Sequence, residues 1–322
     1  ETTGFGAALL DFLVGLAARE VVPQVLSMSL GSLSAASCDL LCEQAVLTYG
    51  HTAEECDSYM ATQRQVCMFL DTDQTQRIST ALQVLGARGV TVVASSGDGG
   101  SHYSFSPFVP SEGDNGIAMD LNAISCTYQI PVFPTTSPYV LSIGGEMWAD
   151  PTTKQGAAAA EVPIWANPVT WASGTYGSGG GVSLQFDMPQ HQKATVEAYL
   201  SQPDMPPSSS YQAGKRAYPD VCALGVQGTS QSAPILGGIF SLLIDMRLNA
   251  GLPPLGCVGP RLYTTAEQYP GEAFDDVVGG NSGLACGDET GFPATEGWDA
   301  NTGFGRPVWD GMVKYFGSDE HL

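Results

Sequence analysis

The sequence has 322 residues, 43% hydrophobic and 14% charged, which is enough to bury one large core without requiring a second domain. Its 33 Asp and Glu against 12 Lys and Arg give a formal charge of -21, and this excludes nucleic acid as an expected partner, because a polyanion would be repelled. Such acidity keeps a protein soluble in an acidic compartment, although an acidic surface without functional meaning is as common.

The chain starts with helix and strand signals. Apolar residues recur at helical spacing over Ala7–Ala18, Pro23 ends the pattern, and Val25–Ser29 follows as a short buried strand that ends at Gly31. The longest apolar stretch, 233–243, is too short and too rich in glycine to span a bilayer, and the first residues lack a signal sequence. We therefore expect a mature, soluble polypeptide without a membrane span.

Four of the eight cysteines gather after the first strand, at Cys38, Cys42, Cys56 and Cys67. No histidine is interleaved at zinc-finger spacing, so disulfides are the better interpretation. The first pair lies about one helical turn apart and the second about three turns apart. One pairing that this spacing allows is a nested one, Cys42 with Cys56 and Cys38 with Cys67, which would staple two antiparallel helices.

A second helix is expected over Thr75–Leu85, closed by Gly86, and then a β-branched strand over Val90–Ala94 that suits burial on both faces. Strand, helix and strand in this order imply a right-handed parallel crossover. Residues 97–138 are rich in Gly, Pro, Ser and Asn, which favours a long surface loop, or excursion, between two strands. A strand over Tyr139–Ile143 follows and is expected to end at Gly144-Gly145.

Glycines at 177–181 mark a place where the backbone bends or is approached closely. Ile235–Arg247 is apolar on most sides and is expected to be a central helix. The alternation of strands and helices as a whole predicts an α/β fold with a doubly wound sheet.

Loops at the carboxyl ends of the parallel strands are where open α/β sheets bind ligands. Three such loops are expected, at 29–31, 96–99 and 143–145, and the string Gly228 to Pro234 opens the apolar helix beside them. Ser230 would then lie near a helix N-terminus, which favours developing negative charge and suits an acyl-transfer nucleophile. The alternatives are a capped helix start at Ser230 and an ordinary turn at Asp98.

Several of these strings occur in the same order in the sedolisins, or serine-carboxyl peptidases, and the chain resembles that family and its tripeptidyl-peptidase branch. The resemblance extends from the first helix to Gly305-Arg306-Pro307. The strings that carry it are Val25-Leu26-Ser27-Met28-Ser29-Leu30-Gly31, Val93-Ala94-Ser95-Ser96-Gly97-Asp98-Gly99, Ser137-Pro138-Tyr139-Val140-Leu141-Ser142-Ile143-Gly144-Gly145, Gly179-Gly180-Gly181, Arg216-Ala217-Tyr218-Pro219-Asp220-Val221 and Gly228-Thr229-Ser230-Gln231-Ser232-Ala233-Pro234.

The resemblance implies a subtilisin-like, mostly parallel sheet and a tripeptidyl-peptidase or endopeptidase that acts through an acyl-enzyme. Ser230 is then the nucleophile, and Asp98 completes the oxyanion hole. An Asp with an ordinary pKa near about 3.9 is a neutral acid at low pH and can donate to an oxyanion, which predicts an acid optimum. The backbone of Ser29, Leu30 and Gly31 is expected to pair with an extended peptide or protein substrate.

The resemblance also implies one calcium site near the end of the chain. Its ligands would be oxygen atoms of Asp276, Val277, Thr295, Gly297 and Asp299, the donors that a hard divalent cation prefers. The alternative is an acidic surface loop without an ion.

The sequence departs from the family in one catalytic feature. The family's base is a Glu four residues before an Asp, and no such pair occurs near this N-terminus; Asp11 has Ala7 at that spacing and is not assigned the role. The stretch between Asp220 and Gly228 is also short, with Gln227 where a small residue is usual. Either the chain starts after a processing cut or gap, or catalysis has been lost.

We therefore expect a single sedolisin-like domain over 1–322 that lacks its N-terminal part, with a Cys-rich helical insert at about 32–72. A companion chain would carry the Glu/Asp pair. The expected location is outside the cell or in a lysosomal or acidic vacuolar lumen, because disulfides persist in oxidising compartments.

Two other functions are weighed against this one. A subtilisin-like Ser-His-Asp peptidase is disfavoured, because His51, His102, His191 and His321 all lie in polar or loop contexts and are expected to be solvated surface residues. The other is a catalytically inactive structural or binding protein of the same fold, which would use the Cys-rich insert as a contact surface.

Overall fold

The computed structural model describes residues 4–63, 66–69, 72–103, 108, 110, 113, 115–147, 169–171, 174–225 and 228–319. At its centre is a parallel sheet in the order β1 (Val25–Met28), β3 (Thr91–Ser95), β5 (Leu141–Glu146) and β10 (Val221–Leu224). Because all neighbouring pairs are parallel, the carboxyl ends of these strands lie at one edge of the sheet.

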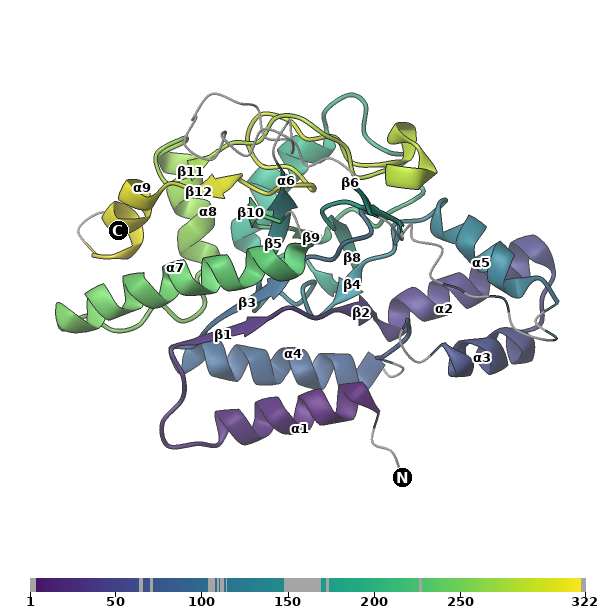
Figure 1. Cartoon of the computed structure of the whole chain (residues 1–322), viewed down its shortest axis with the longest axis horizontal. Coiled ribbons are helices and arrows are strands. Elements are labelled where there is room, and N and C mark those ends of the chain that lie inside the picture. The colour runs from purple at the N-terminus through teal and green to yellow at the C-terminus, as the bar shows by residue number, and fades with distance from the viewer. Residues whose placement is uncertain are drawn as a thin grey trace.

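Helices cover both faces of this sheet, as Figure 1 shows. Residues of β3 alternate between two cores: Val93 packs in the cluster that contains α7 (Thr229–Asn249), and Val92 packs in the cluster of α4 (Thr72–Ala87) and α1 (Phe5–Ala17). The prediction of a strand buried on both faces is confirmed, and so is the doubly wound α/β fold.

Helix α7 was expected to be central, and this is wrong. Its residues Leu236, Phe240 and Leu243 are fully buried, but Leu242 and Leu248 on the opposite side are exposed. The helix covers one face of the sheet and presents apolar side chains to the outside, so its all-round apolar pattern does not mean burial on every side.

The segment 97–138 is not a surface excursion. It contains α5 (Ile117–Ser125), whose residues Ile117, Ala118 and Leu121 are buried, and β4 (Val132–Phe133), which pairs antiparallel with β2 (Ser32–Leu33). The helical period of α5 is short and is flanked by Gly and Pro, so composition outweighed periodicity in the sequence-based prediction.

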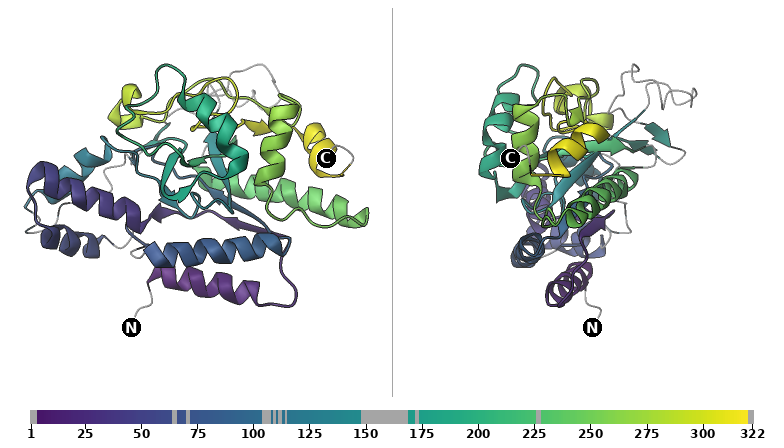
Figure 2. Two further views of the ribbon diagram at one scale, coloured as in Figure 1. Left: turned by 180° about the vertical axis from the view of Figure 1, so that it is seen from behind. Right: turned by 90° about the vertical axis from the view of Figure 1, so that its left-hand side faces the viewer.

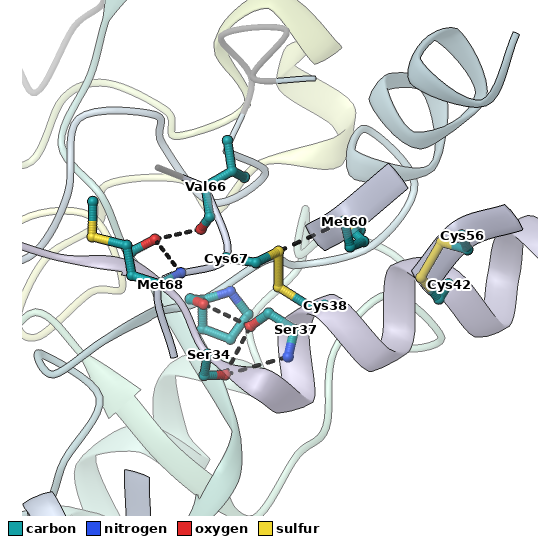
Figure 3. Close-up of a disulfide and its surroundings, with 11 residues drawn as sticks. Ser34, Ser37, Cys38, Cys42, Cys56, Met60, Val66, Cys67 and Met68 are labelled. Carbon is teal, nitrogen blue, oxygen red and sulfur yellow. Dashed lines mark hydrogen bonds between the residues drawn. A yellow bond between two sulfur atoms is a disulfide. The ribbon is translucent and has the colours of Figure 1, made fainter. Parts of the chain in front are cut away.

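The Cys-rich insert and α5 contribute to a third core. The insert consists of β2, α2 (Ala35–Gln44), a π-helical turn (Ala45–Tyr49) and α3 (Ala53–Thr62), and α5 packs against it. The disulfides Cys38–Cys67 and Cys42–Cys56 are both present (Figure 3), which confirms the nested pairing. Cys67 lies beyond the end of α3, so only the inner bond joins two helices.

The remaining elements lie after β5 and are best followed from behind, where α6 (Lys193–Leu200) and α8 (Gly259–Gln268) stand side by side (Figure 2). Antiparallel pairs are formed by β8 (Gly181–Asp187) with β9 (Lys215–Tyr218), β6 (Val169–Trp171) with β7 (Gly174–Tyr176), and β11 (Phe274–Asp275) with β12 (Arg306–Pro307). Short 3-10 helices span Gln190–Gln192, Leu284–Cys286 and Asp288–Thr290, and the last helix is α9 (Trp309–Phe316).

A buried ion pair joins these elements to the sheet. Asp220 Oδ2 accepts hydrogen bonds from Arg216 Nη2 at 2.7 Å and from the Ser142 backbone N–H at 2.7 Å, and its Oδ1 accepts from Tyr263 at 3.0 Å and Gln192 at 3.2 Å. Each lone pair of the carboxylate is therefore engaged, which is the condition under which a buried charge is tolerated.

A search of the described helices for a stretch long and apolar enough to cross a bilayer finds no candidate.

Candidate active site

Three segments distant in the sequence meet at the carboxyl edge of the sheet. Ser29 follows β1, Asp98 follows β3, and Ser230 stands in the first turn of α7. Ser230 is exposed, as are Ser29 and Gly31, while Leu30 is half-buried. The sequence-predicted nucleophile and the predicted substrate-binding segment thus share one accessible edge.

Asp98 caps the start of α7. Its Oδ1 accepts hydrogen bonds from the Thr229 backbone N–H at 2.7 Å and from Thr229 Oγ1 at 2.9 Å. Its Oδ2 lies beside Gly228, where an added Cβ would come within 2.8 Å of it and where the backbone φ is +94°. A side chain at position 228 would therefore displace the carboxyl and strain the backbone.

Thr229 and the glycine run fix the loop that bears Asp98. The Gly97 N–H donates to Thr229 Oγ1 at 3.1 Å, and Gly97 O lies 3.1 Å from the same hydroxyl, whose single hydrogen also faces Asp98 Oδ1. The Gly179 N–H donates to Gly97 O at 2.7 Å, and a Cβ at Gly179 would clash with the backbone of Ser96. The close approach of backbones predicted for 177–181 is confirmed. Gly144 and Gly145, predicted to end a strand, instead lie within β5, which extends to Glu146.

Pro234 explains a contact that involves the Ser230 backbone. Proline lacks an N–H, so the carbonyl four residues earlier, that of Ser230, loses its helical hydrogen bond. Ser29 Oγ donates to this carbonyl at 2.8 Å. The end of β1 is thereby attached to the turn that carries the candidate nucleophile. A proline inside the first two turns of α7 is the sequence signal that could have predicted this partner.

Burial raises the pKa of Asp98 above its usual range, and the two hydrogen bonds from Thr229 oppose part of that rise. The neutral carboxyl persists to a higher pH than in an exposed aspartate. In that form Asp98 can keep accepting from Thr229 through one oxygen and donate through the other.

No His, Asp or Glu side chain among the described residues is hydrogen-bonded to the Ser230 hydroxyl.

The expectation that the histidines are solvated is wrong: His102 is 0% exposed, His51 is paired with Asp120 at 2.7 Å, and His191 is partly buried. His321 and Gln227 lie outside the described residues. The polar sequence context of His51 and His102 did not reveal the backbone and carboxylate groups that the fold brings to them.

The segment predicted to bind calcium places two carboxyl groups close together. Asp299 is fully buried, and its carboxylate accepts from the backbone N–H groups of Thr295 at 3.1 Å, Asn301 at 2.9 Å and Thr302 at 2.7 Å. Burial raises the pKa of Asp299 to about 8, and the nearby Asp276 carboxylate adds to the rise.

Two buried oxygens in this segment have no hydrogen-bond partner, Asp276 Oδ1 and Thr295 Oγ1, while Asp276 Oδ2 accepts from the Gly297 N–H at 2.7 Å. A buried oxygen without a donor is costly, and a hard cation would satisfy it. Among the described residues there is no cluster of three or more His, Cys, Asp or Glu side chains that could hold a metal ion. The predicted site contains two carboxylates, and its other ligands are backbone carbonyls, so it would not form such a cluster. The residues present fit calcium.

Comparison with known proteins gives two kinds of relative. Tripeptidyl-peptidase 1 of Bos taurus is 33% identical over 294 residues, which is 85% of this chain and 44% of the relative. Physarolisin of Physarum polycephalum is 32% identical over 265 residues, 74% of this chain and 44% of the relative. The chain therefore spans less than half the length of the curated relatives it matches. No family model matches.

Among solved structures, a Pseudomonas sedolisin (serine-carboxyl proteinase), complexed with two molecules of pseudo-iodotyrostatin, superposes with a TM-score of 0.62 at 20% identity. The match covers 98% of this chain and 69% of that one. At this identity the likeness concerns the fold, and it agrees with the doubly wound sheet described above.

Proposed function

The chain belongs to the sedolisin family of serine-carboxyl peptidases, and on this premise we propose that it carries the nucleophile and the oxyanion site of an acid-acting peptidase. Its substrate is a peptide or protein, cut as a tripeptidyl-peptidase or an endopeptidase. The observation that carries the proposal is the buried Asp98 carboxyl, held at the first turn of α7 beside the exposed Ser230.

In this mechanism Ser230 Oγ attacks the scissile carbonyl carbon, and its proton passes to a general base. The carbonyl oxygen becomes an oxyanion, which accepts a hydrogen bond from neutral Asp98 and lies at the positive end of α7. Collapse expels the amine, which takes a proton, and leaves the acyl group on Ser230. Water then attacks the ester, releases the acid and restores the hydroxyl.

The general base comes from outside the described residues. The resemblance to the family implies that this base is a Glu/Asp pair, carried by a companion chain or by residues outside the described ranges. The edge strand β1 pairs with β3 on one side, and the backbone of Ser29–Gly31 beyond it, where Ser29 and Gly31 are exposed, is proposed to pair with the substrate.

Calcium is proposed to bind through oxygens of Asp276, Val277, Thr295, Gly297 and Asp299. When bound, it would supply positive charge that keeps both carboxyl groups ionised and holds the loop 295–299 against 276–277. Asp299 also accepts from Thr302, and thus orders the turn at 299–303 without the ion.

An acidic, oxidising compartment is the proposed place of action, inside a lysosome or vacuole or outside the cell. Three disulfides among the described residues support the oxidising environment. The raised pKa of Asp98 supports the acidic one.

The test is peptide hydrolysis at about pH 4 by the whole protein and by its Ser230→Ala variant. We expect the variant to lose at least about a thousandfold in kcat, because the covalent step is removed. Undiminished turnover in the variant would refute the role of Ser230. A folded wild-type protein without hydrolysis above background would instead favour the alternative of an inactive scaffold.

A further inference from the structure

A groove opens between α6 and α8, on the side of the molecule that the left view of Figure 2 shows. Its volume is about 560 Å³, which lies within the range of about 300–1,000 Å³ that ligand pockets span. Ser230, Asp98 and the Ser29–Gly31 segment do not line it. The groove is therefore separate from the candidate active site, and the proposed peptidase reaction gives it no role.

Aromatic rings form the floor of this groove. They are contributed by α6, by the end of α8 and by the segment from β11 onward, and they are Tyr199, Tyr269, Phe274, Trp298 and Phe304. The rings of Tyr199 and Trp298 pack edge to face, with their centres 5.3 Å apart. The Tyr199 hydroxyl donates to Pro293 O at 2.7 Å, and Trp298 Nε1 donates to Pro219 O at 3.0 Å. Both donors are engaged away from the groove, so the floor offers a ligand apolar and π surface.

The rim of the groove is acidic. Glu267 on α8 and Glu296 in the loop before Trp298 are exposed, and both line the groove. Thr195 on α6 donates a hydrogen bond to Glu267, which ties this carboxylate to the opposite wall. Among the described residues that line the groove, none is Lys, Arg or His. The negative charge of the rim is thus not offset by a basic side chain within the groove.

Asp276 and Gly297 lie at one end of the groove, and both also belong to the proposed calcium site. A calcium ion there would offset the charge of the Asp276 carboxylate. The charge that remains for a ligand is consequently that of Glu267 and Glu296. We therefore expect the groove to stay acidic when calcium is present.

The aromatic cluster beside the groove already holds cations where the chain itself supplies them. Lys314 Nζ lies 4.7 Å from the ring centre of Tyr315 and 6.0 Å from that of Tyr269. The Arg261 guanidinium lies 5.7 Å from the ring centre of Phe316. Neither of these basic residues lines the groove, although Tyr269 does. A cation that enters the groove would meet the same chemistry, aromatic rings next to carboxylates.

We propose that this groove binds an arginine side chain of a partner polypeptide, with the guanidinium against the aromatic floor and its N–H groups directed to Glu267 and Glu296. Arginine is favoured over lysine because the guanidinium is planar, weakly hydrated and able to donate to two carboxylates at once. A polypeptide is favoured over a free small molecule because the groove is open at the exposed Pro270, Gly271 and Gly297. The main chain of a partner can then stay at the surface while one side chain enters. A basic partner also complements the formal charge of -21 of this chain.

The first experiment measures binding and its location. The whole protein with Ser230→Ala, which prevents hydrolysis of the probe, is labelled with 15N and titrated with acetyl-arginine methylamide at pH 6.5 in the presence of Ca²⁺. Under these conditions glutamate side chains carry charge. We expect saturable NMR shifts of the Gly271 and Gly297 amides, with a Kd on the order of 1 mM. Shifts confined to Gly31 and Gly97 would place the probe at the active site and overturn the proposal, as would an absence of shifts at about 10 mM probe.

Matched probes test the chemistry of the ligand. Acetyl-citrulline methylamide has a similar shape without the charge and should bind at least about tenfold more weakly. Nα-acetyl-lysine methylamide keeps the charge but not the plane, and its Kd should be about three- to tenfold higher. Equal Kd values for the arginine and citrulline probes would overturn the proposal.

Agmatine separates the two sources of a guanidinium, because it carries this group without a peptide backbone. It should bind no more tightly than acetyl-arginine methylamide. A clearly lower Kd for agmatine would assign the groove to a free small cation and overturn the assignment to a polypeptide.

The variants Glu267→Gln and Glu296→Gln test the rim. Each should raise the Kd of the arginine probe by about three- to fivefold, the usual contribution of an exposed ion pair, and both together by about tenfold. Glu197→Gln is the matched control, since Glu197 is exposed on α6 but does not line the groove. At about 0.15 M salt this control should change the Kd by less than about 1.5-fold. Equal effects of the three single variants would mean that the probe responds to net charge alone, and the proposal would fail.

Discussion

Asp98 faces two demands that conflict for an ordinary aspartate. It accepts hydrogen bonds from Thr229, which favour the charged form, and in the proposed mechanism it also donates one to an oxyanion, which needs the neutral form. Burial shifts the balance toward the neutral form and raises its pKa. A single carboxyl can then cap a helix with one oxygen and polarise a substrate with the other.

The variant Asp98→Asn separates these roles. Asparagine keeps an oxygen for Thr229 and gains a permanent N–H donor, but it does not titrate. In the wild type the active neutral form is present below the raised pKa of Asp98 and is lost as the pH rises through it. We therefore expect the alkaline fall in kcat/KM to shift upward or disappear in Asp98→Asn, as measured in a pH profile.

Asp98→Ala provides the comparison, since it loses both hydrogen-bonding functions. It should lose about a hundred- to a thousandfold in kcat, the usual cost of one oxyanion donor. An alkaline limb at the same pH in Asp98→Asn and wild type would show that another group controls it.

Ser29 offers a second test at this scale, through the carbonyl that Pro234 leaves without a helical donor. Ser29→Ala should lower kcat by about three- to tenfold, as expected for one hydrogen bond worth about 1 kcal/mol. The control is Ser241→Ala on α7. It removes a hydroxyl that donates to Gly237 O at 2.9 Å and should leave kcat unchanged. Equal effects of the two variants would contradict a specific role for Ser29.

Among the elements, the Cys-rich insert shares a core with α5 and the residues that follow it. Its buried residues, Leu41, Cys56 and Tyr59 among them, form a cluster separate from the two that cover the sheet. Figure 3 shows Cys38 and Cys42 on the same helix, each bonded to a different later segment, and Ser37 and Ser34 bonded at the helix start. A unit of this size gains much of its stability from such crosslinks.

Replacement of both Cys42 and Cys56 by Ser is therefore expected to destabilise the insert by about 2–4 kcal/mol. Protection of the α2 and α3 amides from hydrogen exchange should fall, while protection of the β3 and β5 amides is retained. The control is a variant in which two exposed residues are replaced, Thr80→Ala and Ser201→Ala, and hydrogen exchange of the same amides is measured in it. Equal loss of protection in the insert and the sheet would mean that they unfold as one unit.

For the molecule as a whole, the segment of 275–301 joins parts that the sheet does not. Asp275 pairs with Arg306 across β11 and β12, and Asn301 O accepts from Ser178 at 2.7 Å. The two unpartnered oxygens, Asp276 Oδ1 and Thr295 Oγ1, lie in this junction. An ion bound here would stabilise contacts between the end of the chain and the loops beside the active site.

Removal of calcium with EGTA should consequently lower Tm, because a ligand present at about a hundred times its Kd contributes about 2.7 kcal/mol. Added Ca²⁺ should restore Tm and Mg²⁺ should not, since magnesium resists dehydration. In Asp276→Asn the response to EGTA should be lost, whereas the exposed Asp310→Asn should keep it. A Tm indifferent to EGTA in the wild type would refute the calcium site.

The sequence by itself determined local secondary structure and, through several motifs in a fixed order, the family. Local sequence patterns identified β3 and most of α4, and the spacing of four cysteines allowed the pairing that the structure contains. The family followed from six strings in order, because glycines and prolines there meet backbone constraints that few sequences share. The roles of Ser230, Asp98 and the calcium ligands remain predictions.

Only the tertiary structure decided which partners these residues meet. The carbonyls on both sides of His102 come from segments 26 and 188 residues away, and the donor to the Ser230 carbonyl comes from 201 residues away. Burial of α5 and exposure of one side of α7 depend in the same way on which surfaces pack together. Local sequence encodes backbone preference, whereas burial, charge state and hydrogen-bond partners are set by long-range contacts that exist once the chain is folded.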